Sequence, residues 1–202
     1  MIRRLPVLPT LIVLAAVAVM VRLGFWQLDR LGQKQDMLAR FVAASADEAV
    51  LPASAETFGR AAATKHLYRL ADFNCTRVER WQAVSGSNDH GQSGFAHIAQ
   101  CTTDDWLQFG GADRQVDIVI GWSNNPAMPR WSGGSLRGRI SPGGKLGVRL
   151  VADPPLAGLQ PNAKPDPANI ANNHLAYAVQ WFFFALTALV IYALAVRKKL
   201  QP

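Results

Sequence analysis

Charged residues are scarce in this chain of 202 residues. Asp, Glu, Lys and Arg make up 17% of the sequence, whereas hydrophobic residues make up 50%. This apolar composition excludes a disordered chain, and the length is short for two large soluble domains. Acidic residues are the scarcer sign, with 14 against 21 basic ones, which gives a formal net charge of +7.

The positive charge is concentrated at the two tips of the sequence. Arg3, Arg4, Arg197, Lys198 and Lys199 carry five positive charges, and removing five from +7 leaves +2 for the residues between them. Cations that flank apolar segments are the positive-inside signature of membrane proteins. Nucleic-acid binding is not expected, because the sequence has no basic groove pattern interleaved with aromatic residues.

Familiar catalytic motifs are absent. The sequence contains no G-x-S-x-G nucleophile turn, no H-E-x-x-H zinc motif and no glycine-rich phosphate loop. We therefore do not expect an enzyme. A membrane-tethered enzyme or sensor would need a polar cleft in the middle of the chain, and no motif supports one.

Cysteine is limited to Cys75 and Cys101, which both lie in the middle of the chain. A pair of cysteines in an oxidising compartment favours a disulfide, with two separate buried thiols as the alternative. On a strand, His97 and Cys101 would share one face, so that a copper site with Cys75 is a further hypothesis. No C-x-x-C motif or histidine cluster supports that hypothesis.

Two long apolar runs predict membrane-spanning helices. Leu175 to Val196 is a run of about 22 residues in which two tyrosines are the only ionisable groups. At about 1.5 Å per residue, it crosses a hydrocarbon layer about 30 Å thick, and its backbone must then be helical. Leu5 to Val21 is the second run, with Pro6 and Pro9 in its first turns.

The first run has a competing interpretation as a cleaved signal peptide, because Ala16-Val17-Ala18 resembles a cleavage site. The apolar character continues to Trp26, which favours an uncleaved anchor. Arg22 would then lie about one turn from the outer interface. It would be either a side chain that snorkels to the interface or a partner for an anionic group at the membrane edge.

The charge distribution predicts an orientation. Both basic tips are expected in the cytoplasm, and the intervening segment of about 145 residues is expected outside it. We predict spans in residues 1–28 and 174–202 around a domain in residues 29–173, which would lie in a periplasm-like or intermembrane compartment. Of these two, we adopt the periplasm, with both spans in a bacterial inner membrane. Reporter fusions at either tip should behave as cytoplasmic.

The middle of the chain predicts a mainly antiparallel β domain with short helices, either an open sheet or a small barrel. The first helix should continue over residues 27–44, and a short helix should run from Ser54 to about Ala63. Glycine-rich and serine-rich turns separate the candidate strands, and a proline-rich segment at 153–173 returns the chain to the membrane. The expected strands are 68–74, 78–85, 95–101, 116–120, 136–140 and 146–152. The fold class is thus an α+β membrane protein.

The start of the second span carries a candidate ligand. On a helix, His174, Tyr177, Ala178 and Trp181 lie at i, i+3, i+4 and i+7 and share one face. An imidazole beside aromatic rings at the membrane rim can ligate haem iron. The alternative is that His174 is an ordinary polar residue at the interface and that the two aromatic residues belong to the interfacial belt.

Two segments resemble a known family. Residues 24–30 are similar to the G-x-W-Q-x-x-R segment that ends the first span of the Surfeit locus protein 1 family, and residues 172–182 to its N-x-H-L-x-Y-A-x-Q-W-F segment. Gly121-Trp122 matches only the first half of the family's G-W-V-P turn, and the usual L-V-N-R-G segment before it is absent. The function of that loop is therefore in doubt, while the two membrane segments match.

The resemblance implies an assembly factor for cytochrome c oxidase that binds haem a and delivers it to the catalytic subunit. It implies His174 as axial ligand to the haem iron, because that histidine is implicated in haem binding in some bacterial members. Tyr177 and Trp181 would pack beside the haem, Trp26 and Gln27 would lie at the same depth, and Arg30 would pair with a propionate. Expected partners are oxidase subunit 1, haem a synthase and membrane lipid. The alternative is a non-haem scaffold that holds oxidase subunits during assembly.

Overall fold

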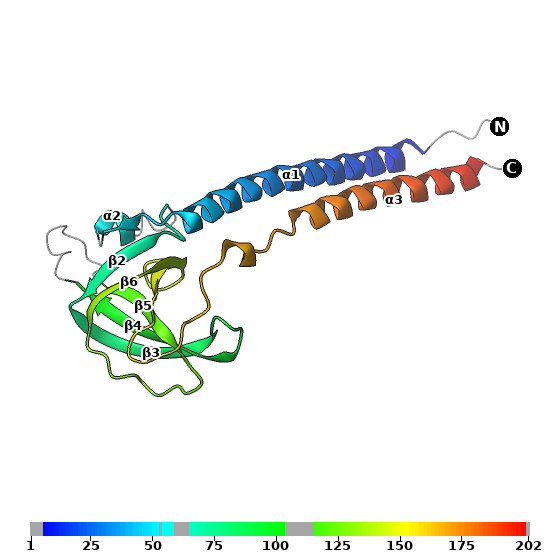
Figure 1. Cartoon of the computed structure of the whole chain (residues 1–202). Helices are drawn as coiled ribbons and strands as arrows, with labels where there is room; N and C mark the ends of the chain where they lie inside the picture. The colour runs from blue at the N-terminus through cyan, green and yellow to red at the C-terminus, as the bar shows by residue number, and fades with distance from the viewer. Residues whose placement is uncertain (1–5, 53, 59–64, 104–114, 201–202) are drawn as a thin grey trace. The chain divides into compact units, whose positions relative to one another are not determined.

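The computed structural model describes residues 6–52, 54–58, 65–103 and 115–200 (Figure 1). The chain forms two compact units. A helical unit comprises Met1–Leu38 and Ile170–Pro202, and a β unit comprises Ala39–Asn169. Arg3 and Arg4, which are predicted to be cytoplasmic, lie outside the described residues.

Helix α1 spans Val7–Ala46. Pro6 immediately precedes it, where a missing N–H costs least, and the Pro6 carbonyl accepts hydrogen bonds from the Thr10 N–H (3.1 Å) and the Thr10 hydroxyl (2.7 Å). The predicted continuation over 27–44 is confirmed, because no proline or glycine pair interrupts the helix there.

Helix α3 spans His174–Leu200. Its first turn is closed by the Tyr177 N–H, which donates to the Asn173 carbonyl at 3.2 Å. Arg197, Lys198 and Lys199 occupy its last turn, where positive charge complements the partial negative charge of the helix C-terminus.

The two helices pack against each other along stripes of less exposed residues that recur every three or four positions. The stripe on α1 is Thr10, Val13, Val17, Met20, Gly24 and Gln27, and the stripe on α3 is His174, Ala178, Trp181, Ala185, Ala188 and Tyr192. This spacing is that of antiparallel helices with interlocking side chains. Small residues let the backbones approach closely, as in membrane helix pairs.

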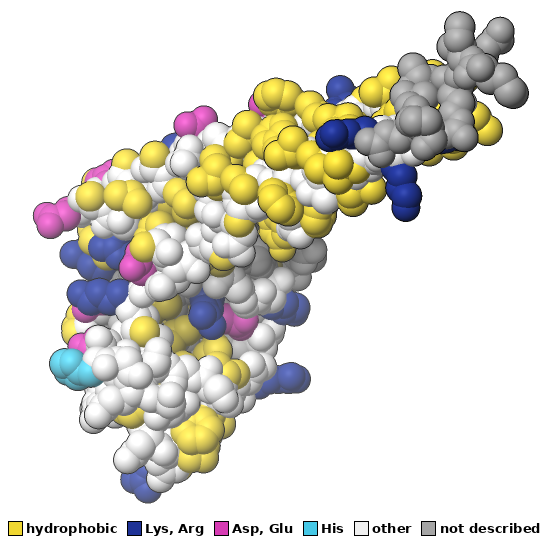
Figure 2. Space-filling view, turned by 90° about the vertical axis from the view of Figure 1, so that its right-hand side faces the viewer, with side chains coloured by type: hydrophobic (Ala, Val, Ile, Leu, Met, Phe, Trp, Pro, Cys, Tyr) yellow, Lys and Arg dark blue, Asp and Glu magenta, His cyan; other side chains and the backbone are white. Residues whose placement is uncertain are grey.

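The outer surfaces of both helices are apolar. Val7 is 70% exposed and Phe183 is 63% exposed, and hydrophobic side chains cover the helical unit in space-filling view (Figure 2). By length and composition, α1 and α3 are each able to cross a membrane. An exposed face of this kind would be unfavourable in water and is favourable in lipid.

The β unit contains one seven-stranded sheet with the strand order β1-β2-β6-β7-β5-β4-β3. All neighbouring strands are antiparallel except the β1–β2 and β5–β7 pairs, which confirms the predicted mainly antiparallel domain. The strands are β1 (Val50–Leu51), β2 (Leu70–Cys75), β3 (Arg77–Ser87), β4 (Ser93–Thr102), β5 (Gln115–Ser123), β6 (Gly134–Pro142) and β7 (Val148–Ala152).

Short helical segments occur among the described residues of the β unit. Helix α2 spans Ala55–Phe58, and a 3-10 turn spans Pro167–Asn169. The predicted capping by Ser54 is confirmed, because the Thr57 N–H donates to Ser54 Oγ at 3.1 Å. The rest of the predicted helix, as far as Ala63, lies outside the described residues.

The core of the β unit is apolar and lies along β5. Val116, Ile118 and Ile120 are fully buried, which confirms the period-two pattern of the sequence. Val119 is also buried, on the opposite face, and packs with Ala96, Ile98 and Val151. Both faces of β5 are therefore covered.

A disulfide joins Cys75 of β2 to Cys101 of β4, with the two Cα atoms 5.3 Å apart. This confirms the predicted bridge, and it contradicts both the alternative of separate thiols and the copper hypothesis, because neither thiol is free to bind metal. His97 is fully buried and lies 2.8 Å from the Ser123 hydroxyl through Nε2. The histidine thus belongs to the sheet's own hydrogen bonding.

Candidate functional site

Two of the predicted site residues meet in the helical unit. His174 is the first residue of α3, and Gln27 lies about six turns along α1 from Pro6. His174 Nδ1 lies 2.7 Å from Gln27 Oε1, within hydrogen-bonding distance. Both residues belong to the stripes along which the helices pack, so the contact follows from the helix register.

The Gln27 contact sets the position of the histidine proton. A carboxamide oxygen only accepts hydrogen bonds, so His174 Nδ1 must carry the proton and donate it. In the neutral imidazole, Nε2 is then unprotonated and presents a lone pair. A metal-ligating histidine is commonly fixed in this way, by donating its other ring N–H to a carbonyl or carboxylate oxygen.

Glycine packing sets the register that brings Gln27 to His174. Gly24 is buried one turn before Gln27, and a Cβ atom built at Gly24 would lie 2.6 Å from the Phe182 ring. The Phe182 ring also meets Phe25 edge to face, with centroids 5.4 Å apart. The aromatic ring therefore occupies space that any larger residue at position 24 would need.

Thr10 and Tyr192 make a second polar contact, near the other ends of the helices. Their hydroxyl groups form a hydrogen bond between α1 and α3. With Gln27–His174, this gives one polar contact toward each end of the helix pair. This pair was not predicted from the sequence, although a threonine and a tyrosine within two apolar runs are a recognisable signal.

The aromatic members of the predicted site differ in their surroundings. Trp26 and Tyr177 are each 51% exposed. Trp181 is half-buried in the packing stripe and meets Phe184 edge to face, with centroids 6.2 Å apart. Tyr177 is therefore more exposed than Ala178 and Trp181, which lie in the packing stripe with His174.

Arg30 is exposed and is engaged on its own helix. Its Nη1 donates to Gln33 Oε1 at 2.7 Å, one turn further along α1. Among the described residues, the structure thus brings Gln27 and His174 together through a hydrogen bond, whereas Arg30 bonds Gln33 and Trp181 packs on Phe184. An exposed pair of this kind on one helix is weak, so Arg30 can exchange Gln33 for an anion.

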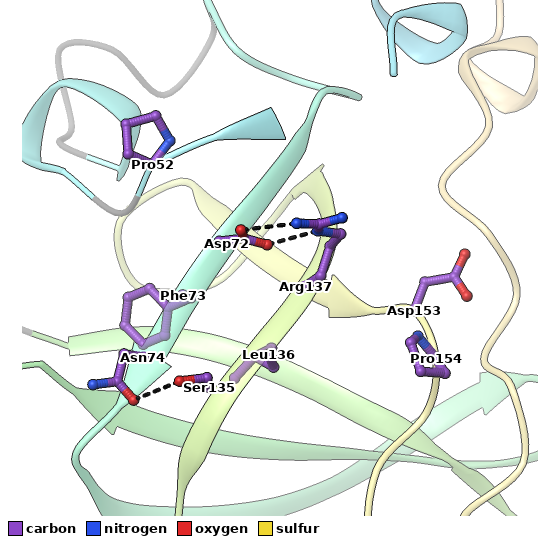
Figure 3. Close-up of a pocket in the computed structure, with 9 residues that line it drawn as sticks. All are labelled: Pro52, Asp72, Phe73, Asn74, Ser135, Leu136, Arg137, Asp153 and Pro154. Atoms are coloured by element: carbon purple, nitrogen blue, oxygen red, sulfur yellow. Dashed lines mark hydrogen bonds and ion pairs between the residues drawn. The ribbon is translucent and has the colours of Figure 1, made fainter. Parts of the chain in front are cut away.

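The β unit has a separate hollow of about 720 Å³ on the outer face of β2 and β6 (Figure 3). Asp72 and Arg137 point toward each other across the two strands and form two hydrogen bonds, at 2.7 and 3.0 Å. The Arg137 guanidinium holds the pKa of the Asp72 carboxyl below its ordinary value. The pair satisfies both charges, and the described residues contain no group of three or more His, Cys, Asp or Glu that could hold a metal ion.

Comparison with curated proteins gives no match. The family model described as SURF1 family matches residues 14–186. This match covers most of α1, the whole sheet and the start of α3, including Gln27 and His174. The chain therefore belongs to the SURF1 family, whose members are in general non-enzymatic assembly factors for cytochrome oxidase.

Proposed function

We propose that the helical unit binds haem a and passes it to subunit 1 of cytochrome c oxidase during assembly of that enzyme. The observation that carries the proposal is the hydrogen bond between His174 Nδ1 and Gln27 Oε1, which leaves the lone pair of Nε2 available to ligate iron. Membership of the SURF1 family supports the general role in oxidase assembly.

The donor chemistry fits haem iron. Haem iron accepts an axial imidazole nitrogen, and a neutral histidine with its lone pair on Nε2 supplies one. Gln27 keeps the proton on Nδ1 and restrains rotation of the ring, so it acts as a positioning residue. Because His174 is half-buried at the start of α3, the imidazole is oriented without being sealed in the core.

The other predicted residues would flank the cargo. Trp26 and Tyr177 keep about half of their surface exposed, which leaves aromatic area for a flat apolar ring. Trp181 would support the site from within the helix pair through its contact with Phe184. Arg30 would release Gln33 and form charge-assisted hydrogen bonds with a propionate.

A carrier must also let go of its cargo. Binding that is too tight would retain haem a, because the oxidase subunit must bind the cofactor more tightly than the carrier does. A single histidine donor at a partly exposed rim suits this need better than a closed pocket with ligands on both sides.

We further propose the membrane arrangement predicted from the sequence, with spans in residues 1–28 and 174–202 and residues 29–173 in the periplasm of a bacterial inner membrane. The disulfide between Cys75 and Cys101 supports an oxidising location for the β unit. The cations in the last turn of α3 support a cytoplasmic C-terminus. In this arrangement haem a synthase, the source of the cargo, would be a neighbour in the same membrane.

The test is an absorption spectrum of protein purified from cells that make haem a. The wild-type protein should carry a haem band, His174→Ala should lose it, and Gln27→Leu should weaken it because Nδ1 loses its acceptor. Gln27→Glu keeps an accepting oxygen and should retain the band. His90→Ala is the matched control, because His90 lies on an exposed loop of the β unit.

An absent band, or a band unchanged by His174→Ala, would reject the proposed site. Co-purification of oxidase subunits with a colourless protein would then identify the non-haem scaffold as the function. Recovery of oxidase activity by the variants in a deletion strain separates the two cases, because a scaffold would tolerate His174→Ala.

A further inference from the structure

A hollow of about 960 Å³ on α1 is not used by the haem proposal, apart from Trp26 at its margin. Its described wall contains Ala18, Val19, Arg22, Phe25, Trp26 and Asp29. Arg22 is two residues from Gly24, a rotation of about 200° around the helix. Since Gly24 packs on Phe182 of α3, the Arg22 side of α1 faces away from α3.

The two charged residues of this hollow lack partners within the described part of the chain. Arg22 and Asp29 are both exposed, and neither makes a hydrogen bond or ion pair with another described residue. Arg22 lies inside the apolar span, where an unpaired cation is strongly unfavourable unless it meets an anion or water. Arg22 is about one turn from the outer end of this span, so its long side chain reaches the level of the lipid headgroups, where a negatively charged group can pair with it.

The remaining wall is apolar. Val19 and Phe25 are each 58% exposed, and Trp26 is 51% exposed. Ala18 and Asp29 are eleven residues apart, which corresponds to about 16 Å along the helix, or about half of the 30 Å hydrocarbon layer. Because Asp29 lies beyond the apolar run, this length covers the outer part of one membrane leaflet together with its headgroup level, with the apolar end at Ala18.

The order of the charges specifies the headgroup. Moving outward along α1, the apolar residues Ala18, Val19 and Val21 are followed by the Arg22 cation. Leu23, Phe25 and Trp26 come next, and the Asp29 carboxylate closes the wall. A phospholipid with a terminal amine has acyl chains, a phosphate and an ammonium group in the same order. Arg22 can hydrogen-bond the phosphate, and Asp29 can accept hydrogen bonds from a primary ammonium but not from a quaternary one.

We propose that this face of α1 binds one phospholipid with a primary amine headgroup, such as phosphatidylethanolamine, in the outer leaflet. Arg22 holds its phosphate and Asp29 holds its amine. The inference rests on insertion of α1 in a membrane, and Trp26 is the one residue that it shares with the haem proposal.

The test uses full-length protein from cells that make no haem a, exchanged into bilayer discs of equal phosphatidylethanolamine, phosphatidylglycerol and phosphatidylcholine. Lipids retained after detergent extraction are counted by mass spectrometry. Wild-type protein should retain phosphatidylethanolamine over phosphatidylcholine. Arg22→Gln should lower total retention about fivefold, the effect expected of one cation near a charged lipid group.

Asp29→Asn should keep lipid retention but lose the preference for the primary amine. Arg40→Gln and Asp36→Asn are the matched controls, because both residues are exposed on α1 outside the hollow. Equal retention of the three lipids by wild-type protein, or retention unchanged by Arg22→Gln, would overturn the proposal. Helix content measured by circular dichroism confirms that each variant is folded.

Discussion

The helical unit and the β unit are stabilised in different ways. The β unit buries large aliphatic side chains such as Ile118, Ile140 and Leu150 and adds a covalent bridge between β2 and β4. Among the described residues of the helical unit, the buried ones are the small residues Gly24, Ala178 and Ala185, and many large apolar side chains face outward. The β unit, which has a large apolar core, can be stable in water, whereas the helical unit needs lipid around it.

This difference explains where the candidate site lies. Helices that pack through small residues leave room at their ends for polar side chains such as Gln27 and His174 to meet. The sheet instead pairs its polar groups internally, as Asp72 and Arg137 show. The predictions that follow test the contrast, starting with the largest expected effect.

Removing the disulfide should affect the β unit strongly. Replacing Cys75 and Cys101 by Ala releases a bridge that spans 26 residues, and we expect a loss of about 3 kcal/mol in the free energy of unfolding. Denaturant titration followed by tryptophan fluorescence measures it, since Trp122 lies buried in the sheet. An unchanged midpoint would show that the packed core alone sets the stability.

Enlarging Gly24 should loosen the helix pair. Gly24→Ala places a Cβ atom 2.6 Å from the Phe182 ring, so we expect a loss of about 1–3 kcal/mol in helix association. Gly32→Ala is the matched control, because a Cβ there meets nothing within 4 Å. Combining Gly24→Ala with Phe182→Leu should restore part of the loss, as measured by thermal unfolding in detergent. No difference between the two glycines would reject the packing argument.

The β unit should lose stability in mild acid because of His97. Burial lowers the pKa of His97, so the folded protein binds a proton less readily than the unfolded chain. The contribution of neutral His97 to the free energy of unfolding is complete above the ordinary histidine pKa of about 6.5. It is lost as the pH falls through the lowered pKa of the folded state.

We expect the effect of His97 to be smaller than the two above, because it involves one side chain. His97→Gln should flatten the pH dependence of the unfolding midpoint between pH 7 and 5. His90→Gln, on an exposed loop, should leave the pH dependence as it is. A slope that His97→Gln does not change would assign the acid sensitivity to other groups.

The smallest expected effect concerns the hydrogen bond between Thr10 and Tyr192. Hydrogen bonds between membrane helices contribute about 0.6 kcal/mol on average, so Tyr192→Phe should weaken helix association by about that amount. A double-mutant cycle with Thr10→Val isolates the coupling between the two side chains. Additive single and double variants would mean that the hydroxyl groups do not stabilise each other.

Much of the fold could be predicted from local patterns. Run lengths near 20 apolar residues predicted both long helices, and the alternation of Val116, Ile118 and Ile120 predicted β5. The order of the strands could not be predicted, because the parallel β5–β7 pair joins segments that are far apart in sequence. Strand ends also differed slightly, since the strand expected from Tyr68 begins at Leu70.

The candidate site was predictable in part. The resemblance to the SURF1 family pointed to Gln27 and His174 but not to their direct contact, which depends on the register of two helices. That register is set by Gly24 and Phe182, and no one-dimensional pattern relates a glycine to an aromatic ring on another helix. The roles of Trp26, Arg30, Tyr177 and Trp181 remain predictions for the spectroscopic test.

The hydrogen bond between Gln27 and His174 makes the position of the proton on the His174 imidazole depend on the alignment of α1 and α3. A slide of one helical turn, about 5.4 Å, would take the amide oxygen out of reach of the imidazole. Under the proposed function, an oxidase subunit that separated the helices on docking would remove the acceptor of the Nδ1 proton and so release the restraint on the His174 tautomer. Binding and release of haem would then be controlled by movement of the helices and not by a chemical reaction.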